Sequence, residues 1–259
     1  MSIIHREIAE GIFQLSSDTF PLSTEPGKAS RNAYLVKGKE YALLFDLSLE
    51  EPELFAYASR LADKPVRLVL SHGHVDHIYH LSSCKEAWLH QGDERLLREG
   101  CVFQRPVKPC PHLHFLCDGE RIELGERTLQ TVHIPGHTDG SILLWDERSG
   151  LLLSGDTVAR RLLYGIHSFV PFADFRQNLM QLKKLPIRQI YSVHDRCALP
   201  FDHLDLMIEC LSPETLENAR RITIPLLGRF IHLTAGEENS LRYFDLVALC
   251  RRKRQEQEE

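Results

Sequence analysis

Three histidines and an aspartate lie within six residues of one another, directly after an apolar run. Residues 71–80 read SHGHVDHIYH, and the cluster occupies positions 72–77. The preceding residues 66–70, VRLVL, have the pattern of a buried strand. Neutral imidazole and carboxylate both bind metal ions well, and a solvent-facing loop has no structural need for so many of them. The segment therefore predicts a metal site where a strand ends.

The spacing inside the cluster favours two ions rather than one. Residues two apart in an extended segment point the same way, so His72 and His74 are placed to bind a common ion. Once the chain turns after Gly73, Asp76 and His77 are free to reach a second ion nearby.

Three more side chains that bind metals follow strand-like runs further along the chain. His137 follows the run LQTVHIPG, Asp156 follows LLLSG, and His194 follows QIYSV. Binding sites in sheet proteins are built from the loops at strand ends. Either Asp156 or His194 alone would be a weak indication, and the repeated order of strand and then ligand is what supports them.

At this point the chain resembles the metallo-beta-lactamase superfamily over about residues 10–200. The motifs occur in that family's order, with intervals of 63, 19 and 38 residues from His74 onward. They are His72-Gly73-His74-Val75-Asp76-His77, Gly136-His137-Thr138, Gly155-Asp156-Thr157 and the late His194.

The resemblance implies two divalent metal ions, with zinc expected and iron or manganese as alternatives. The first ion would be held by His72, His74 and His137, the second by Asp76, His77 and His194, and Asp156 would bridge both. An aspartate at 156 resembles the hydroxyacylglutathione hydrolase and lactonase branches. Zinc beta-lactamases of the commonest class have a cysteine there, so hydrolysis of antibiotics is not expected.

Helices and strands alternate along the chain, which predicts an α/β fold with a pair of mixed sheets. The resemblance refines this to a four-layer αββα sandwich over residues 1–200, with a helix-plus-hairpin appendage over 201–259. Expected helices are 53–63, 93–98, 175–184, 204–210 and 213–222, with Asp93 and Asp174 as candidate caps. The expected C-terminal hairpin joins 230–234 to 241–246, and residues 101–118 resemble an irregular lid or insertion. The appendage either covers the metal cleft or only stabilises the domain.

Charge and composition argue against a nucleic-acid or membrane partner, and the expected partner is a small-molecule substrate. The net charge is −5, and the single dense basic cluster, Arg251–Arg254, resembles a solvated helix end, so no nucleic-acid partner is expected. No apolar run reaches the ~18 residues that a membrane helix needs. Seven irregularly spaced cysteines and a polar start without a signal peptide predict free thiols in the cytoplasm. The oligomeric state stays open.

The predicted chemistry is hydrolysis of a small ester, thioester or lactone by a hydroxide that bridges two metal ions. Asp76 is the candidate catalytic residue, because its carboxylate can orient the hydroxide as well as bind metal. Tyr164 and His167 resemble a substrate-facing loop of the family, although packing is the slightly favoured explanation. The alternatives are an iron-dependent oxidoreductase similar to persulfide dioxygenases and a phosphodiesterase. A non-catalytic binding module is disfavoured because no ligand is missing.

Overall fold

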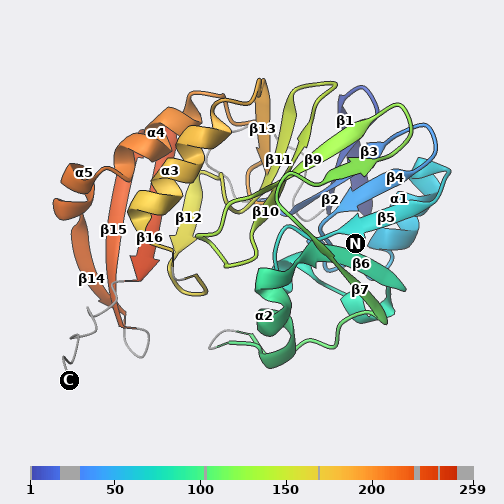
Figure 1. Ribbon diagram of the computed structural model, residues 1–259, viewed down its shortest axis with the longest axis horizontal. Helices are drawn as coiled ribbons and strands as arrows, with labels where there is room; N and C mark the ends of the chain where they lie inside the picture. Colours follow the sequence, from blue (N-terminus) through green and yellow to red (C-terminus); the bar gives the residue numbers. More distant parts are fainter. Residues whose placement is uncertain are drawn as a thin grey trace.

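Two β-sheets lie face to face in the computed structural model, and a third, smaller sheet stands to one side of them (Figure 1). The structure describes residues 2–17, 30–101, 104–168, 170–224, 228–238 and 240–249. The basic cluster at Arg251–Arg254 lies outside these ranges.

The first sheet has seven strands in chain order, antiparallel from β1 to β4 and parallel from β4 to β7. Its strands are β1 (Ile3–Ala9), β2 (Ile12–Ser17), β3 (Asn32–Lys37), β4 (Ala42–Phe45), β5 (Val66–Val69), β6 (Glu86–His90) and β7 (His112–Leu116). The second sheet has the order β13-β11-β10-β9-β8. Its strands are β8 (Arg121–Glu123), β9 (Thr128–His133), β10 (Ile142–Asp146), β11 (Leu151–Gly155) and β13 (Gln189–Ser192).

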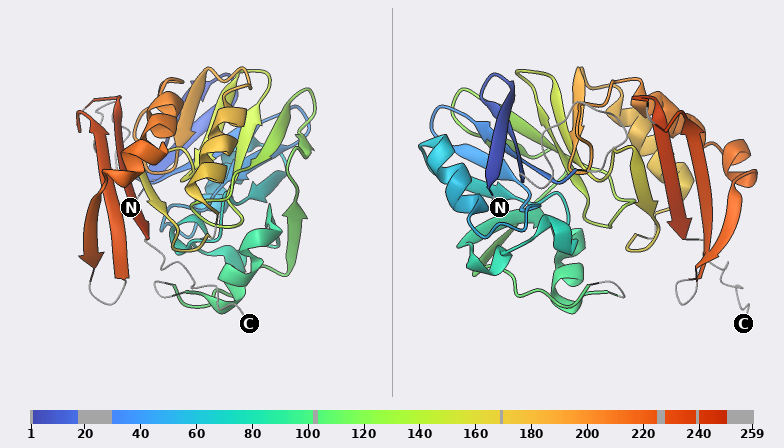
Figure 2. Two further views of the ribbon diagram at one scale, coloured as in Figure 1. Left: turned by 60° about the vertical axis from the view of Figure 1, so that its left-hand side comes forward. Right: turned by 180° about the vertical axis from the view of Figure 1, so that it is seen from behind.

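The third sheet has the order β12-β16-β15-β14 and lies beyond two helices (Figure 2). Its strands are β12 (Arg161–Tyr164), β14 (Arg220–Ile224), β15 (Gly228–Gly236) and β16 (Tyr243–Leu249). The α-helices are α1 (Leu54–Ala62), α2 (Glu94–Glu99), α3 (Phe172–Leu182), α4 (His203–Cys210) and α5 (Pro213–Glu217). No helix within the described ranges is long and apolar enough to cross a membrane.

Apolar packing sets the order of the layers. Tyr34 and Phe45 from the first sheet meet Leu144 and Leu153 from the second in one buried cluster. The outer face of the first sheet packs on the buried side of α1, and the outer face of the second packs on α3 and α4. The sequence of layers is thus helix, sheet, sheet, helix, and the expected α/β class is confirmed.

Several expected elements differ from the structure. The expected helix over 213–222 ends at Glu217, and β14 follows as a strand paired with β15. The expected C-terminal hairpin is present as β15 and β16, and β14 and β12 extend it to a four-stranded sheet. Residues 112–116, expected within an irregular segment, form the edge strand of the first sheet. Asp174 lies inside the first turn of α3, whose N-cap is Pro171. A carboxylate there still favours the positive end of the helix dipole.

Candidate metal centre

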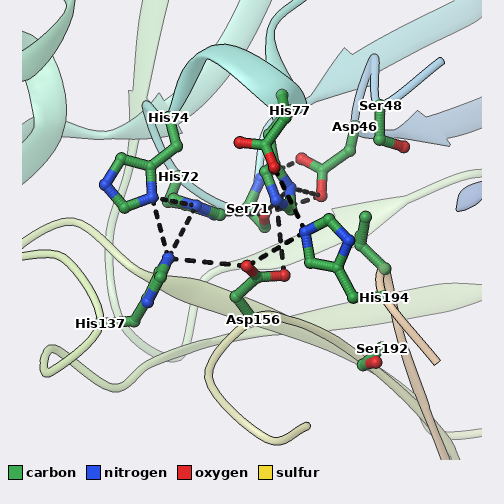
Figure 3. A network of polar contacts seen from close by, with 12 residues as sticks. Asp46, Ser48, Ser71, His72, His74, His77, His137, Asp156, Ser192 and His194 are labelled. Carbon is green, nitrogen blue, oxygen red and sulfur yellow. Dashed lines mark hydrogen bonds and ion pairs between the residues drawn. The ribbon is translucent and has the colours of Figure 1, made fainter. Parts of the chain in front are cut away.

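The loops that follow four strands meet at one edge of the two facing sheets (Figure 3). They come after β5, β9, β11 and β13, two strands or more from each other in sequence. The structure brings together all the predicted ligands, in three overlapping groups whose ligand atoms lie within 4.8 Å of one another. The groups are His72, His74 and His137; His72, His77 and Asp156; and Asp76, His77 and His194.

Three imidazole nitrogens converge in the first group. Nδ1 of His74 lies 2.9 Å from Nε2 of His72 and 2.9 Å from Nε2 of His137, and the last two atoms are 3.1 Å apart. Nδ1 of His137 lies 2.8 Å from the carbonyl oxygen of Leu163, which only accepts, so this nitrogen carries the proton. Nε2 of His137 therefore presents a lone pair to the other two rings.

Ser71 orients His72 in the same way. Its hydroxyl donates to Oδ2 of Asp46 at 2.7 Å, and therefore accepts from Nδ1 of His72 at 2.9 Å. The Nε2 lone pair of His72 is then free to face the group. Burial lowers the pKa of His72, His74 and His137, and neighbouring histidines lower that of His72 and His74 further. These rings are neutral at pH 7, as metal binding requires.

A buried histidine and a buried carboxylate face each other on the other side of the centre. Nδ1 of His77 donates to Oδ2 of Asp46 at 2.9 Å, and its Nε2 lies 3.4 Å from Oδ1 of Asp156. Both atoms are buried, and neither has a hydrogen-bond partner in the described structure. A buried polar atom without a partner is costly, and a metal ion or a proton between the two atoms removes that cost.

His194 repeats this arrangement. Its Nδ1 donates to the carbonyl oxygen of Ser30 at 3.1 Å, and its Nε2 lies 3.4 Å from Oδ2 of Asp76 and 3.3 Å from Oδ2 of Asp156. Asp156 thus lies between the two histidine groups, with Oδ2 also 3.7 Å from Nε2 of His137 (Figure 3). The donor set of imidazoles and carboxylates fits two divalent ions.

The electrostatics confirm that this half of the centre favours positive charge. Burial opposes the charged form of His77, but the Asp156 and Asp46 carboxylates outweigh it and raise the pKa of His77 to about 10. Burial would likewise raise the pKa of Asp76, yet the hydrogen bond with His194 and the charge of His77 lower it. The carboxylates are therefore ionised, and a bound cation or a proton on the rings balances them.

The Asp93 carboxylate forms hydrogen bonds with two of the loops that carry candidate ligands. Its carboxylate accepts from the amide of Gly73 at 2.7 Å, the hydroxyl of Thr138 at 2.8 Å and the amide of Gly140 at 2.7 Å. The sequence suggested a helix cap for Asp93, but its side chain makes no capping hydrogen bond to α2. Burial raises the pKa of Asp93 to about 6 in spite of these three donors.

A cleft of about 300 Å³ opens beside the ligands. Its lining combines four of them with residues of the third sheet, so that sheet forms one wall of the cleft. The lining residues are His74, Asp76, His137 and Asp156 with Arg161, Leu162, Leu163, Asp245 and Val247.

The two residues suggested as substrate contacts lie behind or beside the cleft lining. Tyr164 is buried, donates its hydroxyl to the carbonyl of Val170 at 2.7 Å and stacks on Phe172. His167 is half-buried, and its ring centroid is 4.9 Å from that of His74. The structure gives Tyr164 a packing role, and contact of either residue with a substrate stays a prediction.

Residues 26–194 match the family model described as the metallo-beta-lactamase superfamily. The probable metallo-hydrolase YqgX of Bacillus subtilis is 29% identical over 145 residues, which is 51% of this chain and 68% of that protein. The acyl-coenzyme A thioesterase MBLAC2 of Gallus gallus is 28% identical over 185 residues, which is 60% of this chain but 65% of that protein, just under two thirds. A metallo-beta-lactamase structure from Pontibacter korlensis has a TM-score of 0.64 at 16% identity, covering 81% of this chain and 99% of that one.

Proposed function

The chain belongs to the metallo-beta-lactamase superfamily, and from that premise we propose that it is a hydrolase of small thioesters with two metal ions at its centre. The observation that carries the proposal is the convergence of seven imidazole and carboxylate side chains in three overlapping groups, with Nε2 of His77 and Oδ1 of Asp156 buried and unpaired between them. When bound, the ions would activate water at neutral pH and polarise the carbonyl group of the substrate.

The residues of the chain have distinct roles in this proposal. His72, His74 and His137 would hold one ion, and Asp76, His77 and His194 the other, with Asp156 between them. The Asp76 carboxylate lines the cleft and is ionised, so it is placed to accept a hydrogen bond from the attacking water and aim it. Acceptors behind the rings, such as the Leu163 carbonyl, fix their orientation before substrate arrives.

A thioester is the proposed substrate because the MBLAC2 relative is named an acyl-coenzyme A thioesterase. The cleft also carries an apolar flank beside the ligands, suited to an acyl group. Asp156 stands where the commonest zinc beta-lactamases have cysteine, so we propose little beta-lactamase activity. Zinc as the metal, a small-molecule partner and a cytoplasmic location belong to the same proposal.

The first test is a substrate screen with metal analysis. Protein reconstituted separately with zinc, iron and manganese is assayed against acyl thioesters, lactones, phosphodiesters and a chromogenic cephalosporin. We expect close to two metal equivalents and the highest kcat/KM on a thioester. Oxygen uptake with a persulfide, or a phosphodiester turned over fastest, would replace the proposal with an oxidoreductase or a phosphodiesterase.

The second test compares Asp76→Ala with His80→Asn. Losing the group that aims the water typically costs ~10²- to 10⁴-fold in rate, and loss of a metal ligand places Asp76→Ala at the upper end of this range. The His80 side chain is exposed and contacts the Glu50 carbonyl through Nε2, and the residue has a φ of 58°, which asparagine tolerates. The His80→Asn control is expected to keep its metal and most of its activity. Near-normal turnover by Asp76→Ala would defeat the ligand assignment.

A further inference from the structure

The two faces of the third sheet have different surroundings. Leu162 of β12 and Leu246 of β16 are buried against the helices, within the same cluster as Phe175 of α3. The alternate residues of these strands point the other way, because successive side chains of a strand alternate between its faces. On β12 these are Arg161 and Leu163, and on β16 they are Asp245 and Val247, all of which line the cleft.

We propose that Leu163 and Val247 form an acyl subsite beside the metal centre, and that the Arg161–Asp245 ion pair closes its far end, so that short acyl groups are preferred. The inference rests on the proposed thioesterase function and names the determinants of its acyl specificity.

The backbone of Leu163 contacts one of the candidate metal ligands. Its carbonyl accepts from Nδ1 of His137 at 2.8 Å, so the residue lies immediately beside a ligand. Its side chain is 40% exposed, one of only five large apolar side chains with such exposure in the described ranges. Val247 is the registered partner of Leu163 across the parallel β12–β16 pair, and both line the cleft. An apolar pair exposed at a catalytic centre is suited to an apolar part of the substrate.

The ion pair lies two residues before the apolar pair on each strand. Arg161 and Asp245 are themselves registered partners, about 7 Å along the strands from Leu163 and Val247. Nε of Arg161 lies 3.7 Å from Oδ2 of Asp245, and His232 lies 3.0 Å from the other oxygen. Laying a hydrocarbon chain over these charges would remove water from them and return no hydrogen bond. The apolar subsite therefore ends where the ion pair begins.

The test measures how the acyl chain length affects kcat/KM. Straight-chain acyl thioesters of one small thiol, from two to twelve carbons, are assayed with metal-loaded wild type, Val247→Phe and the double variant Arg161→Leu/Asp245→Leu. Each methylene that enters the subsite contributes ~0.8 kcal/mol, so kcat/KM is expected to rise up to about fourfold per carbon and then level or fall. The break is expected at a shorter chain in Val247→Phe and at a longer chain in the double variant.

The matched control is Met180→Phe. Met180 is 42% exposed on α3 and is not part of the cleft lining, so the break should stay in place. A second series keeps the acyl group constant and varies the thiol. If the variants respond to the length of the thiol instead of the acyl group, or if all of them keep the wild-type acyl profile, the subsite is refuted.

Binding separates failure of the subsite from failure of the function. Alkyl thioethers of the same lengths, which cannot be hydrolysed, are titrated into the metal-loaded proteins by calorimetry. A break in Kd that moves with the two variants, in a protein that turns over no thioester, would support the apolar subsite and refute the thioesterase function. Unchanged thioether affinities in a working thioesterase would refute the subsite alone.

Discussion

At the scale of single residues, Asp93 is a buried carboxylate whose charged form is disfavoured by the loss of solvent. Its carboxylate takes three hydrogen bonds from two ligand loops, yet burial raises its pKa to about 6 from an ordinary value of 3.8. The folded state therefore binds this proton more tightly than the unfolded chain does. The contribution of Asp93 to stability is fully present below about pH 4 and decreases as the pH rises through about 6.

We predict that Asp93→Asn destabilises the protein more at pH 4.5 than at pH 7.5. The amide has only one acceptor oxygen for three donors, and a buried donor left unpaired costs about 1–3 kcal/mol. The wild type loses about 2 kcal/mol between these two pH values through Asp93, whereas the variant does not, so the gap in stability between them should narrow as the pH rises. Urea unfolding of the metal-free proteins at both pH values measures it.

Asp63→Asn serves as the comparison, because Asp63 is exposed at the C-cap of α1 and its φ of 55° suits asparagine. Its effect should be small. A gap between wild type and Asp93→Asn that widens with rising pH would show that the buried carboxyl is not protonated near pH 6.

The convergence of the candidate ligands was predictable from the sequence because imidazole and carboxylate groups carry their chemistry in the residue type. The hydrogen-bond acceptors that orient the imidazole rings could not be predicted in this way. Two of them are backbone carbonyls, of Leu163 and Ser30, and any residue supplies a carbonyl. Asp46 directly follows the strand β4, but only its contacts with Ser71 and His77 in the folded protein show what it orients.

At the scale of elements, one buried arginine joins the second sheet to the first. Arg127 precedes β9, and its Nε lies 3.5 Å from Oδ1 of Asp146 at the end of β10. Its other nitrogens donate to the carbonyls of Lys37 at 3.1 Å and Glu10 at 2.7 Å, which belong to the first sheet and its β1–β2 turn. Both charged side chains are almost fully buried.

We predict that Arg127→Ala lowers the free energy of unfolding by about 3–5 kcal/mol, because it leaves the Asp146 charge buried without its partner. Urea denaturation measures this loss. Arg121→Ala, which breaks an exposed pair with Glu147, should change stability little. Equal effects of the two substitutions would mean that Arg127 is no more than a surface contact.

Strands and helices with a clear period were predicted well, and the errors have physical causes. The segment 213–222 contains residues that suit either helix or strand. Ser212 and Pro213 start a helix, but it ends after Glu217, and the following residues pair with β15. That pairing depends on a partner strand that local pattern does not reveal. The strand β1 was missed for the same reason, since its polar residues gain order from pairing with β2.

At the scale of the whole molecule, the C-terminal part shares one core with the rest. The cluster that contains Phe175 and Leu143 also contains Leu204, Met207 and Leu246. We therefore predict that a chain shortened to residues 1–200 loses cooperative folding, because this apolar surface would be exposed and β12 would lack its partner strand. Thermal unfolding followed by near-ultraviolet circular dichroism measures it. A sharp transition close to that of the full chain would instead show that residues 201–259 are separable.

The parallel pairing of β12 with β16 also sets an order of events during synthesis. All seven ligands have left the ribosome once residue 194 has emerged, but the wall of the cleft needs a strand that ends at Leu249. At about 5–20 residues per second, several seconds separate the two moments. A nascent chain thus has all seven candidate ligands outside the ribosome before the strand that completes the cleft wall has been synthesised.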